Sequence, residues 1–230
     1  MKKDSFYDDR VVIKPWGYEH VVYRDKDKLC VTLLNINYKQ KTSLHCHPNK
    51  KSGFMLLKGK AAFQLGLKKK NLEIHSSPSK RMIARGLFHQ LTSLSKSGLI
   101  ALEFETPVDK NDLVRFKDVY GREKRNYEGK KHTLKVDSKF IKFKKPSHKI
   151  KQEFIFDNVK LNIEIHSNFK KLLSNKKDSI FAILDGAITD HRNIGVVNCG
   201  DILRVDDFKI LSKVFKIKKN LKIVKLSKIK

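Results

Sequence analysis

Two histidines, His45 and His47, stand one residue apart and are followed by an apolar run that ends at Gly59. Residues i and i+2 of a β-strand point to the same face, so the two imidazoles can converge on one metal ion, which a helical pair of this spacing cannot do. Downstream, His89 follows a glycine turn at Gly86 and offers a third imidazole. The pattern predicts an open metal site on neighbouring strands of a small barrel. The alternative is three ordinary core or surface histidines.

The segments around this motif are short, rich in β-branched residues and separated by turn signals. Leu29–Tyr38 alternates partly between apolar and polar residues, and Phe54–Leu57 and Ala61–Leu65 flank a glycine turn like the arms of a hairpin. Many short strands of this kind predict an all-β fold, a sandwich or a barrel. We expect one short helix in the first half, over residues 111–122, ending at Gly121. In the second half we expect strands alone, including one over Ile210–Ile217.

The chain of 230 residues is long enough for two units that each bury a core. We expect a metal-binding domain over residues 1–122, a lysine-rich linker over residues 123–150, and a second β domain over residues 151–230. A weak internal repeat relates Gly53–Ala61 to Ser179–Ala187, both an apolar stretch followed by a glycine and a small residue.

The repeat has a consequence for the second domain. With Gly59 aligned to Gly186, the positions that match the two histidines are Leu172 and Ser174. Neither side chain is a strong metal ligand. We therefore expect no metal site of this type there, and a structural or assembly role for this half.

The formal net charge is +27, with most of the excess in lysines spread along the chain. Such a charge can indicate nucleic-acid or membrane binding. No helix-turn-helix pattern, zinc knuckle or arginine–aromatic platform accompanies it, so compositional bias explains the lysines better. We expect neither a specific nucleic acid nor a membrane as partner, and a basic surface that attracts phosphorylated or nucleotide-activated sugars.

Three features bear on the compartment. No apolar run approaches the roughly 18 residues that span a bilayer, and we expect no signal peptide. The cysteines, Cys30, Cys46 and Cys199, are few and widely spaced, as is typical of reduced thiols. We therefore expect a cytoplasmic protein.

Several segments together resemble the cupin family, most closely the C-terminal cupin of type II mannose-6-phosphate isomerases and related cupins of sugar and polysaccharide pathways. They are Lys14–Glu19, Ser43–His47 with Leu57–Gly59, and Asp112–Arg115 with Asp118–Arg122. The resemblance implies two jelly-roll β-barrels, the first with a metal at its centre and the second degenerate, in a homodimer.

The chain departs from the family pattern at identifiable positions. Ser52 stands where the motif has a glutamate ligand, and His45 stands where the isomerases have a glutamine. In the second motif, Ala84 and Ser93 replace a proline and an asparagine. A three-histidine set is still sufficient to hold a divalent metal ion, Zn, Fe, Mn, Ni or Co.

The resemblance implies a site in which His45, His47 and His89 hold the metal. Glu103 and Glu105 share one face of their strand and could supply the missing carboxylate, as ligand or general base; salt-bridged acids at a barrel rim are the alternative. Arg115 and Arg122 could bind a substrate phosphate, or could instead pair with the nearby Asp112 and Asp118.

The reaction that the resemblance implies is aldose–ketose isomerisation of a phosphorylated or nucleotide-activated sugar. Two alternatives remain open. One is a non-catalytic sugar-binding or regulatory cupin, and the other is an Fe(II) dioxygenase with a three-histidine site.

Overall fold

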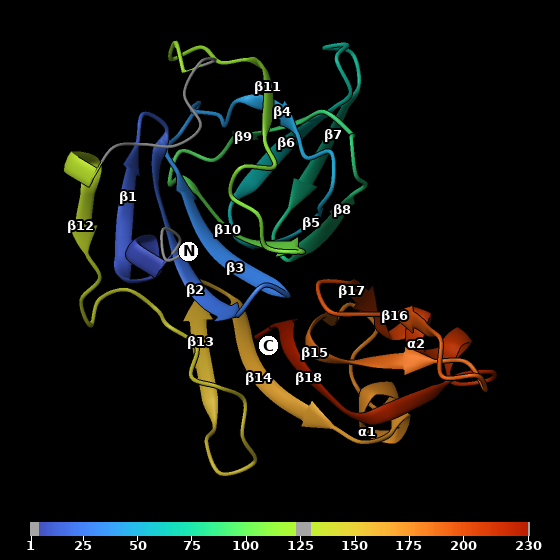
Figure 1. The fold of residues 1–230 in the computed structure, drawn as a ribbon. Coiled ribbons are helices and arrows are strands. Elements are labelled where there is room, and N and C mark those ends of the chain that lie inside the picture. The colour runs from blue at the N-terminus through green and yellow to red at the C-terminus, as the bar shows by residue number, and fades with distance from the viewer. Residues whose placement is uncertain (1–4, 123–129, 230) are drawn as a thin grey trace. The chain divides into compact units, whose positions relative to one another are not determined.

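The computed structural model describes residues 5–122 and 130–229, and the chain divides after Lys142 into two compact units. Both units are built mainly from antiparallel strands, which confirms the all-β prediction (Figure 1). None of the helices in the described ranges is long and apolar enough to cross a membrane.

The first unit contains a seven-stranded and a five-stranded sheet. The order in the larger sheet is β12 (Thr133–Lys135), β1 (Arg10–Lys14), β2 (Gly17–Asp25), β3 (Leu29–Ile36), β10 (Leu99–Thr106), β5 (Lys51–Lys58) and β8 (Ser79–Ile83). In the smaller sheet it is β11 (Val114–Lys117), β4 (Leu44–Cys46), β9 (His89–Ser93), β6 (Lys60–Leu65) and β7 (Leu72–Ser76). Two 3-10 turns, Ser5–Asp9 and Lys130–His132, complete the described part.

Side chains from both sheets form one core, as expected when alternating strands bury one face. Phe54 and Leu56 come from β5, Phe63 from β6, Leu91 from β9 and Ala101 from β10. Neighbours along the chain are often far apart in the sheets, since β10 lies between β3 and β5. This crossing brings the acidic residues of β10 beside the strand that follows the histidine pair.

The second unit contains one sheet and two short helices. The sheet order is β13 (Gln152–Phe156), β14 (Val159–His166), β18 (Lys216–Lys228), β15 (Ile180–Thr189) and β16 (Gly195–Val197), with β17 (Ile202–Arg204) paired to β15. Helices α1 (Phe169–Leu173) and α2 (Val205–Leu211) contribute Leu172 and Phe208 to a core with Phe181 and Ile183. The unit thus has one sheet where the first has two.

Two local expectations were wrong. Residues 114–117, expected as part of a helix, form β11, the edge strand of the smaller sheet, because they pair with β4. This pairing turns Arg115 towards the pocket while Val114 and Phe116 stay exposed. Residues 205–211, partly expected as strand, form α2. Asp207 caps this helix by accepting a hydrogen bond from the Arg204 backbone N–H at 2.7 Å.

The internal repeat does not extend to the structure. Gly59 makes the turn between β5 and β6, with φ +85°. Gly186, its counterpart, lies inside the single strand β15, where the pairing with β18 shifts register. Leu172 and Ser174, aligned with the histidine pair, lie in α1 and at its C-terminal cap.

Part of the expected linker lies in the first unit. Strand β12 pairs with β1, and the His20 Nε2–H donates to the Ile141 carbonyl at 3.1 Å. Residues 143–150 lie in the second unit, and residues 123–129 lie outside the described part of the chain.

Candidate metal centre

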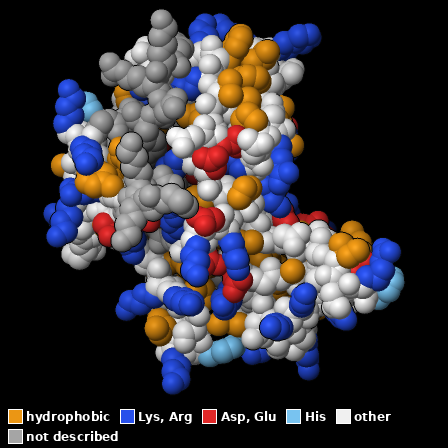
Figure 2. Space-filling model, viewed as in Figure 1, with side chains coloured by type: hydrophobic (Ala, Val, Ile, Leu, Met, Phe, Trp, Pro, Cys, Tyr) orange, Lys and Arg blue, Asp and Glu red, His pale blue; other side chains and the backbone are white. Residues whose placement is uncertain are grey.

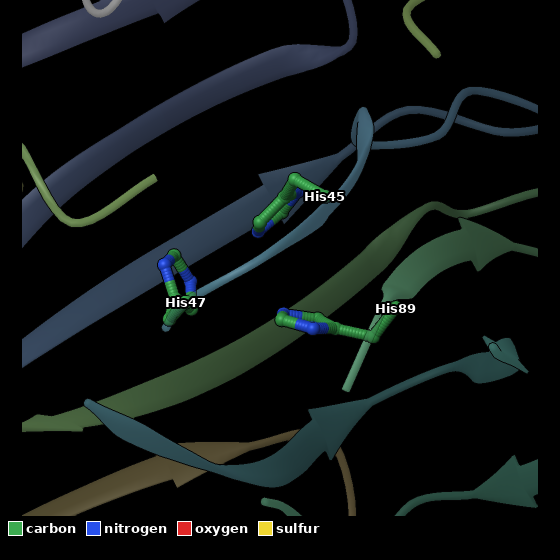
Figure 3. A group of neighbouring side chains, drawn as sticks. All are labelled: His45, His47 and His89. Atoms are coloured by element: carbon green, nitrogen blue, oxygen red, sulfur yellow. The ribbon is translucent and has the colours of Figure 1, made fainter. Parts of the chain in front are cut away.

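The three histidines come from two adjacent strands of the smaller sheet. His45 lies on β4, His47 directly follows it, and His89 begins β9, where it stands opposite His45 in the register. Their rings point into the same space (Figure 3). The ring centroids of His45 and His89 are 4.5 Å apart, those of His45 and His47 4.9 Å, and those of His47 and His89 5.4 Å.

A backbone carbonyl fixes each ring through its Nδ1 atom. His45 Nδ1 lies 2.9 Å from the Ser43 carbonyl oxygen, His47 Nδ1 2.6 Å from that of Asp112, and His89 Nδ1 3.0 Å from that of Leu87. Because a carbonyl oxygen only accepts, each Nδ1 carries the proton and each Nε2 keeps a lone pair.

The Nε2 atoms of His47 and His89 are buried without a hydrogen-bond partner among the described residues. A buried polar atom without a partner costs free energy unless a ligand satisfies it. One ligand nitrogen from each of the three rings lies within 4.8 Å of the others. Three neutral imidazoles whose Nδ1 atoms donate to backbone carbonyls are a donor set that fits a divalent metal ion.

The protonation of the rings agrees with this arrangement. Burial lowers the pKa of His89 to about 4, with a further contribution from His47. Burial likewise lowers the pKa of His45 well below its ordinary value, and that of His47 to a lesser degree. All three rings are therefore neutral at physiological pH, the form that binds metals.

The two candidate carboxylates lie on β10 beside the histidines. Glu105 stands opposite Ser52 of β5, and Glu103 opposite Phe54. Ligand atoms of Glu103, Glu105 and His47 lie within 4.8 Å of one another. Because opposite residues of an antiparallel pair share a face, the carboxylate absent at position 52 has a counterpart on the neighbouring strand.

Lys50, which the sequence analysis did not single out, lies in this group. Its side chain is 5% exposed; its Nζ forms an ion pair with Glu105 Oε1 and donates to the Asp109 carbonyl oxygen at 3.1 Å. Although burial opposes ionisation, Lys50 and His47 lower the pKa of Glu105 to about 2. Burial and the neighbouring Glu105 raise the pKa of Glu103 to about 8.

Asp112 was considered only as an arginine partner, but it holds the segment after the histidine pair. Its carboxylate accepts from the backbone N–H groups of Asn49, at 3.0 Å, and Lys50, at 2.8 Å. Its own carbonyl oxygen is the partner of His47 Nδ1. Asp112 thus positions both His47 and Lys50.

The two candidate phosphate-binding arginines both line the pocket next to the histidines. The Arg122 guanidinium donates two hydrogen bonds to Asp118, from Nε to Oδ2 at 2.6 Å and from Nη2 to Oδ1 at 3.1 Å. Arg115 stands opposite His45 on β11 and donates from Nη1 to the Arg122 carbonyl oxygen at 3.2 Å. The pairing with Asp118, one of the two alternatives, therefore occurs for Arg122.

The pocket has a cavity volume of about 110 Å³, several times the roughly 10–15 Å³ that one water needs. Charged side chains line it unevenly. The carboxylates are Glu19, Glu103 and Glu105, and the cations are Lys14, Lys50, Lys110, Arg115 and Arg122. The excess of cations favours an anionic ligand.

No protein-family model matches the chain, and no curated protein matches it. Solved structures with similar folds include a protein with a double-stranded β-helix domain from Klebsiella pneumoniae (15% identity, 37% of this chain, 69% of that chain, TM-score 0.35). They also include KdgF from Halomonas sp. (12% identity, 42% and 85%, TM-score 0.38) and the capsular polysaccharide assembling protein CapF from Staphylococcus aureus (14% identity, 47% and 34%, TM-score 0.41). These likenesses concern the fold alone and carry no argument about substrate.

Proposed function

We propose that this protein is a metal-dependent isomerase of a phosphorylated or nucleotide-activated sugar, similar in chemistry to mannose-6-phosphate isomerase. One observation carries the proposal. The neutral imidazoles of His45, His47 and His89 converge, and the Nε2 atoms of His47 and His89 are buried without a partner among the described residues. Beside them lies a cationic pocket that is also lined by Glu103, a carboxyl group with a raised pKa.

His45, His47 and His89 are the proposed ligands of a divalent ion, Zn, Fe, Mn, Ni or Co. A bound ion would polarise the carbonyl and hydroxyl oxygens of the sugar. The Nδ1 hydrogen bonds to backbone carbonyls fix the orientation of the rings before any ion binds.

Glu103 is the proposed general base. Aldose–ketose isomerisation moves a proton from the carbon beside the carbonyl group to the former carbonyl carbon, while the proton of the adjacent hydroxyl group passes to the former carbonyl oxygen. A pKa of about 8 allows Glu103 to take the proton as carboxylate and give it back as acid near neutral pH. Glu105 stays ionised beside Lys50, and its charge helps to raise the pKa of Glu103. The two carboxyl groups therefore have different pKa values, and Glu103 is the one that can exchange a proton near neutral pH.

Arg115 is the proposed phosphate contact, since it lines the pocket opposite His45. Arg122 contributes charge to the same pocket while its guanidinium holds Asp118. A planar guanidinium binds phosphate oxygens in pairs, which suits a phosphorylated sugar.

The test combines metal analysis with an assay of interconversion between aldose and ketose 6-phosphates, starting with mannose 6-phosphate. We expect near one metal per chain and a Glu103→Gln variant whose kcat falls about 100-fold or more. Glu73→Gln is the matched control, because Glu73 lies in the same unit and pairs with Arg81.

Other outcomes would replace the proposal. Sugar-phosphate binding without turnover, unaffected by Glu103→Gln, would identify a sugar-binding cupin. Oxygen consumption that depends on Fe(II) would identify a dioxygenase.

A homodimer and a cytoplasmic location are part of this proposal. The three cysteines form no disulfide bond, as is typical of cytoplasmic proteins. The outer face of the five-stranded sheet supports the dimer. Val114 and Phe116 on β11, and Leu72 and Ile74 on β7, are 48%, 56%, 56% and 61% exposed. Figure 2 shows hydrophobic side chains gathered in the upper part of the view, where Figure 1 draws these strands.

The four exposed side chains are uncharged and apolar, so a second copy of this face can cover them and remove them from water. Two chains of net charge +27 repel each other, and that repulsion is smallest where they meet through uncharged side chains. We expect light scattering to give a dimer that Phe116→Lys with Ile74→Lys converts to a monomer. Ile155→Lys, at a 64% exposed position of the second unit, is the control; a monomeric wild type would overturn the proposed dimer.

A further inference from the structure

We infer that Lys50 keeps Glu105 out of the metal's ligand set, so that the centre is a neutral three-histidine site beside a closed Lys50–Glu105 ion pair. The inference rests on the metal site of the proposed function and makes Lys50 a positioning residue that determines the charge of that site.

The structure offers two overlapping ligand groups that share His47. One consists of the three histidines, and the other joins His47 to Glu103 and Glu105, each with its ligand atoms within 4.8 Å of one another. Distance alone does not decide between a three-histidine centre and one that includes a carboxylate.

The partners of Lys50 argue against Glu105 as a metal ligand. The ammonium group is buried, pairs with Glu105 Oε1 and donates to the Asp109 carbonyl. The backbone N–H of the same residue is bonded to the Asp112 carboxylate, so the chain is fixed at this point. If Glu105 turned to a metal, a buried ammonium would lose its counter-ion, which is strongly unfavourable.

The histidines have no such competitor. Their Nδ1 atoms are held by carbonyls, and the Nε2 atoms of His47 and His89 have no partner in the described part of the chain. A dication therefore gains more from the imidazoles than from a carboxylate that already has a cation beside it.

This assignment has a chemical consequence. A metal held by three neutral ligands keeps its full positive charge, whereas a carboxylate ligand would neutralise part of it. The centre would therefore attract anionic oxygens of a substrate more strongly and polarise them more. Lys50 thereby favours anionic substrates at the metal.

The test uses Co²⁺ as the metal, with its affinity from competition titration and its ligand set from the visible absorption spectrum. In Lys50→Met/Glu105→Gln both charges are removed in nearly isosteric form, so this variant is expected to fold. We expect its affinity within about threefold of wild type and an unchanged spectrum, because neither side chain is a ligand. An affinity about tenfold lower with an altered spectrum would overturn the inference.

A single substitution gives the opposite expectation. Lys50→Met alone releases Glu105, so the affinity should rise about tenfold and the spectrum should change as a carboxylate joins the histidines. Lys50→Arg keeps the ion pair and should behave as wild type. If Lys50→Met does not fold, the double variant still decides.

The two proposals fail differently. If wild type binds Co²⁺ and the double variant loses it, Glu105 is a ligand and only the present inference is wrong. If neither wild type nor any variant binds Co²⁺, the metal site itself is wrong, and the inference falls with it.

Discussion

Each unit contains a group formed by a histidine, a glutamate and a lysine, and the two groups use their atoms differently. In the second unit, His166 Nε2 donates to Glu164 Oε2 at 2.8 Å, and Lys225 Nζ donates to Glu164 Oε1 at 2.9 Å. The histidine nitrogen that remains, Nδ1, is buried without a partner. No second ligand atom converges on it to form a metal group among the described residues.

In the first unit, the corresponding residues are His47, Glu105 and Lys50. Here the lysine pairs with the glutamate, but the histidine bonds to a backbone carbonyl and keeps its Nε2 atom for the space shared with His45 and His89. The same residue types thus form a closed ion-pair chain in one unit and an open centre in the other. What distinguishes a candidate site is the set of atoms left unsatisfied and convergent, and not the residue types.

The largest expected effect is a difference in metal content between variants of the two histidine groups. His45→Ala with His47→Ala should reduce the metal per chain from near one to near zero, because two of three ligands are lost. His166→Ala should leave the metal content unchanged. Elemental analysis of the purified proteins measures both, and a loss of metal in His166→Ala would contradict the comparison.

The second prediction concerns the stability that the closed group provides. Burial raises the pKa of Glu164, but hydrogen bonds from His166 and Lys225 outweigh it and bring the value to about 2. The folded-state pKa lies below the ordinary 4.5, so Glu164 stabilises the fold above pH 4.5, and this contribution is lost as the pH falls towards 2.

We therefore expect Glu164→Gln to lower the free energy of unfolding at pH 7 by about 2 kcal/mol, after allowance for partial exposure. The difference should vanish near pH 2. Denaturant titrations at both pH values measure it, with Asp157→Asn, on the exposed turn between β13 and β14, as control. An equal loss at both pH values would show that packing and not charge is responsible.

The third prediction concerns the support of the open centre. Asp112→Ala removes the carboxylate that holds the backbone of Asn49 and Lys50, and so loosens the segment that carries His47. We expect the metal affinity to fall about tenfold while the three histidines remain in place. Competition titration measures the affinity, with Asp109→Ala as control because Lys50 contacts only the carbonyl of that residue. Equal affinities in the two variants would argue against a positioning role.

Strand periodicity accounts for most of what the sequence predicted. The i, i+2 spacing of His45 and His47 predicted their common face, and the same spacing predicted that of Glu103 and Glu105. The structure brings both pairs together because β10 enters the sheet beside β5. Their roles as ligands and base stay predictions.

The features that could not be predicted from the sequence depend on contacts between residues far apart in the chain. Lys50 looks like any other of the chain's many lysines until β10 places Glu105 beside it. Asp112 acts on a segment more than sixty residues away. Residues 114–117 became a strand through pairing with β4, which local propensity does not encode.

The smallest expected effect tests whether the surroundings of Glu103 in the first unit keep its carboxyl group neutral. Burial and Glu105 raise its pKa to about 8, so the folded state resists ionisation that the unfolded chain undergoes near pH 4.5. The sign is therefore opposite to that of Glu164: stability falls as the pH rises from 4.5 towards 8. In metal-free protein at pH 8.5, Glu103→Gln should raise the free energy of unfolding by at least about 1 kcal/mol, and at pH 4 it should change nothing. Glu73→Gln should show neither effect.

A Glu103→Gln variant equally stabilised at both pH values would mean that this carboxyl group is not held neutral, and the proposed division of roles between Glu103 and Glu105 would lose its physical basis.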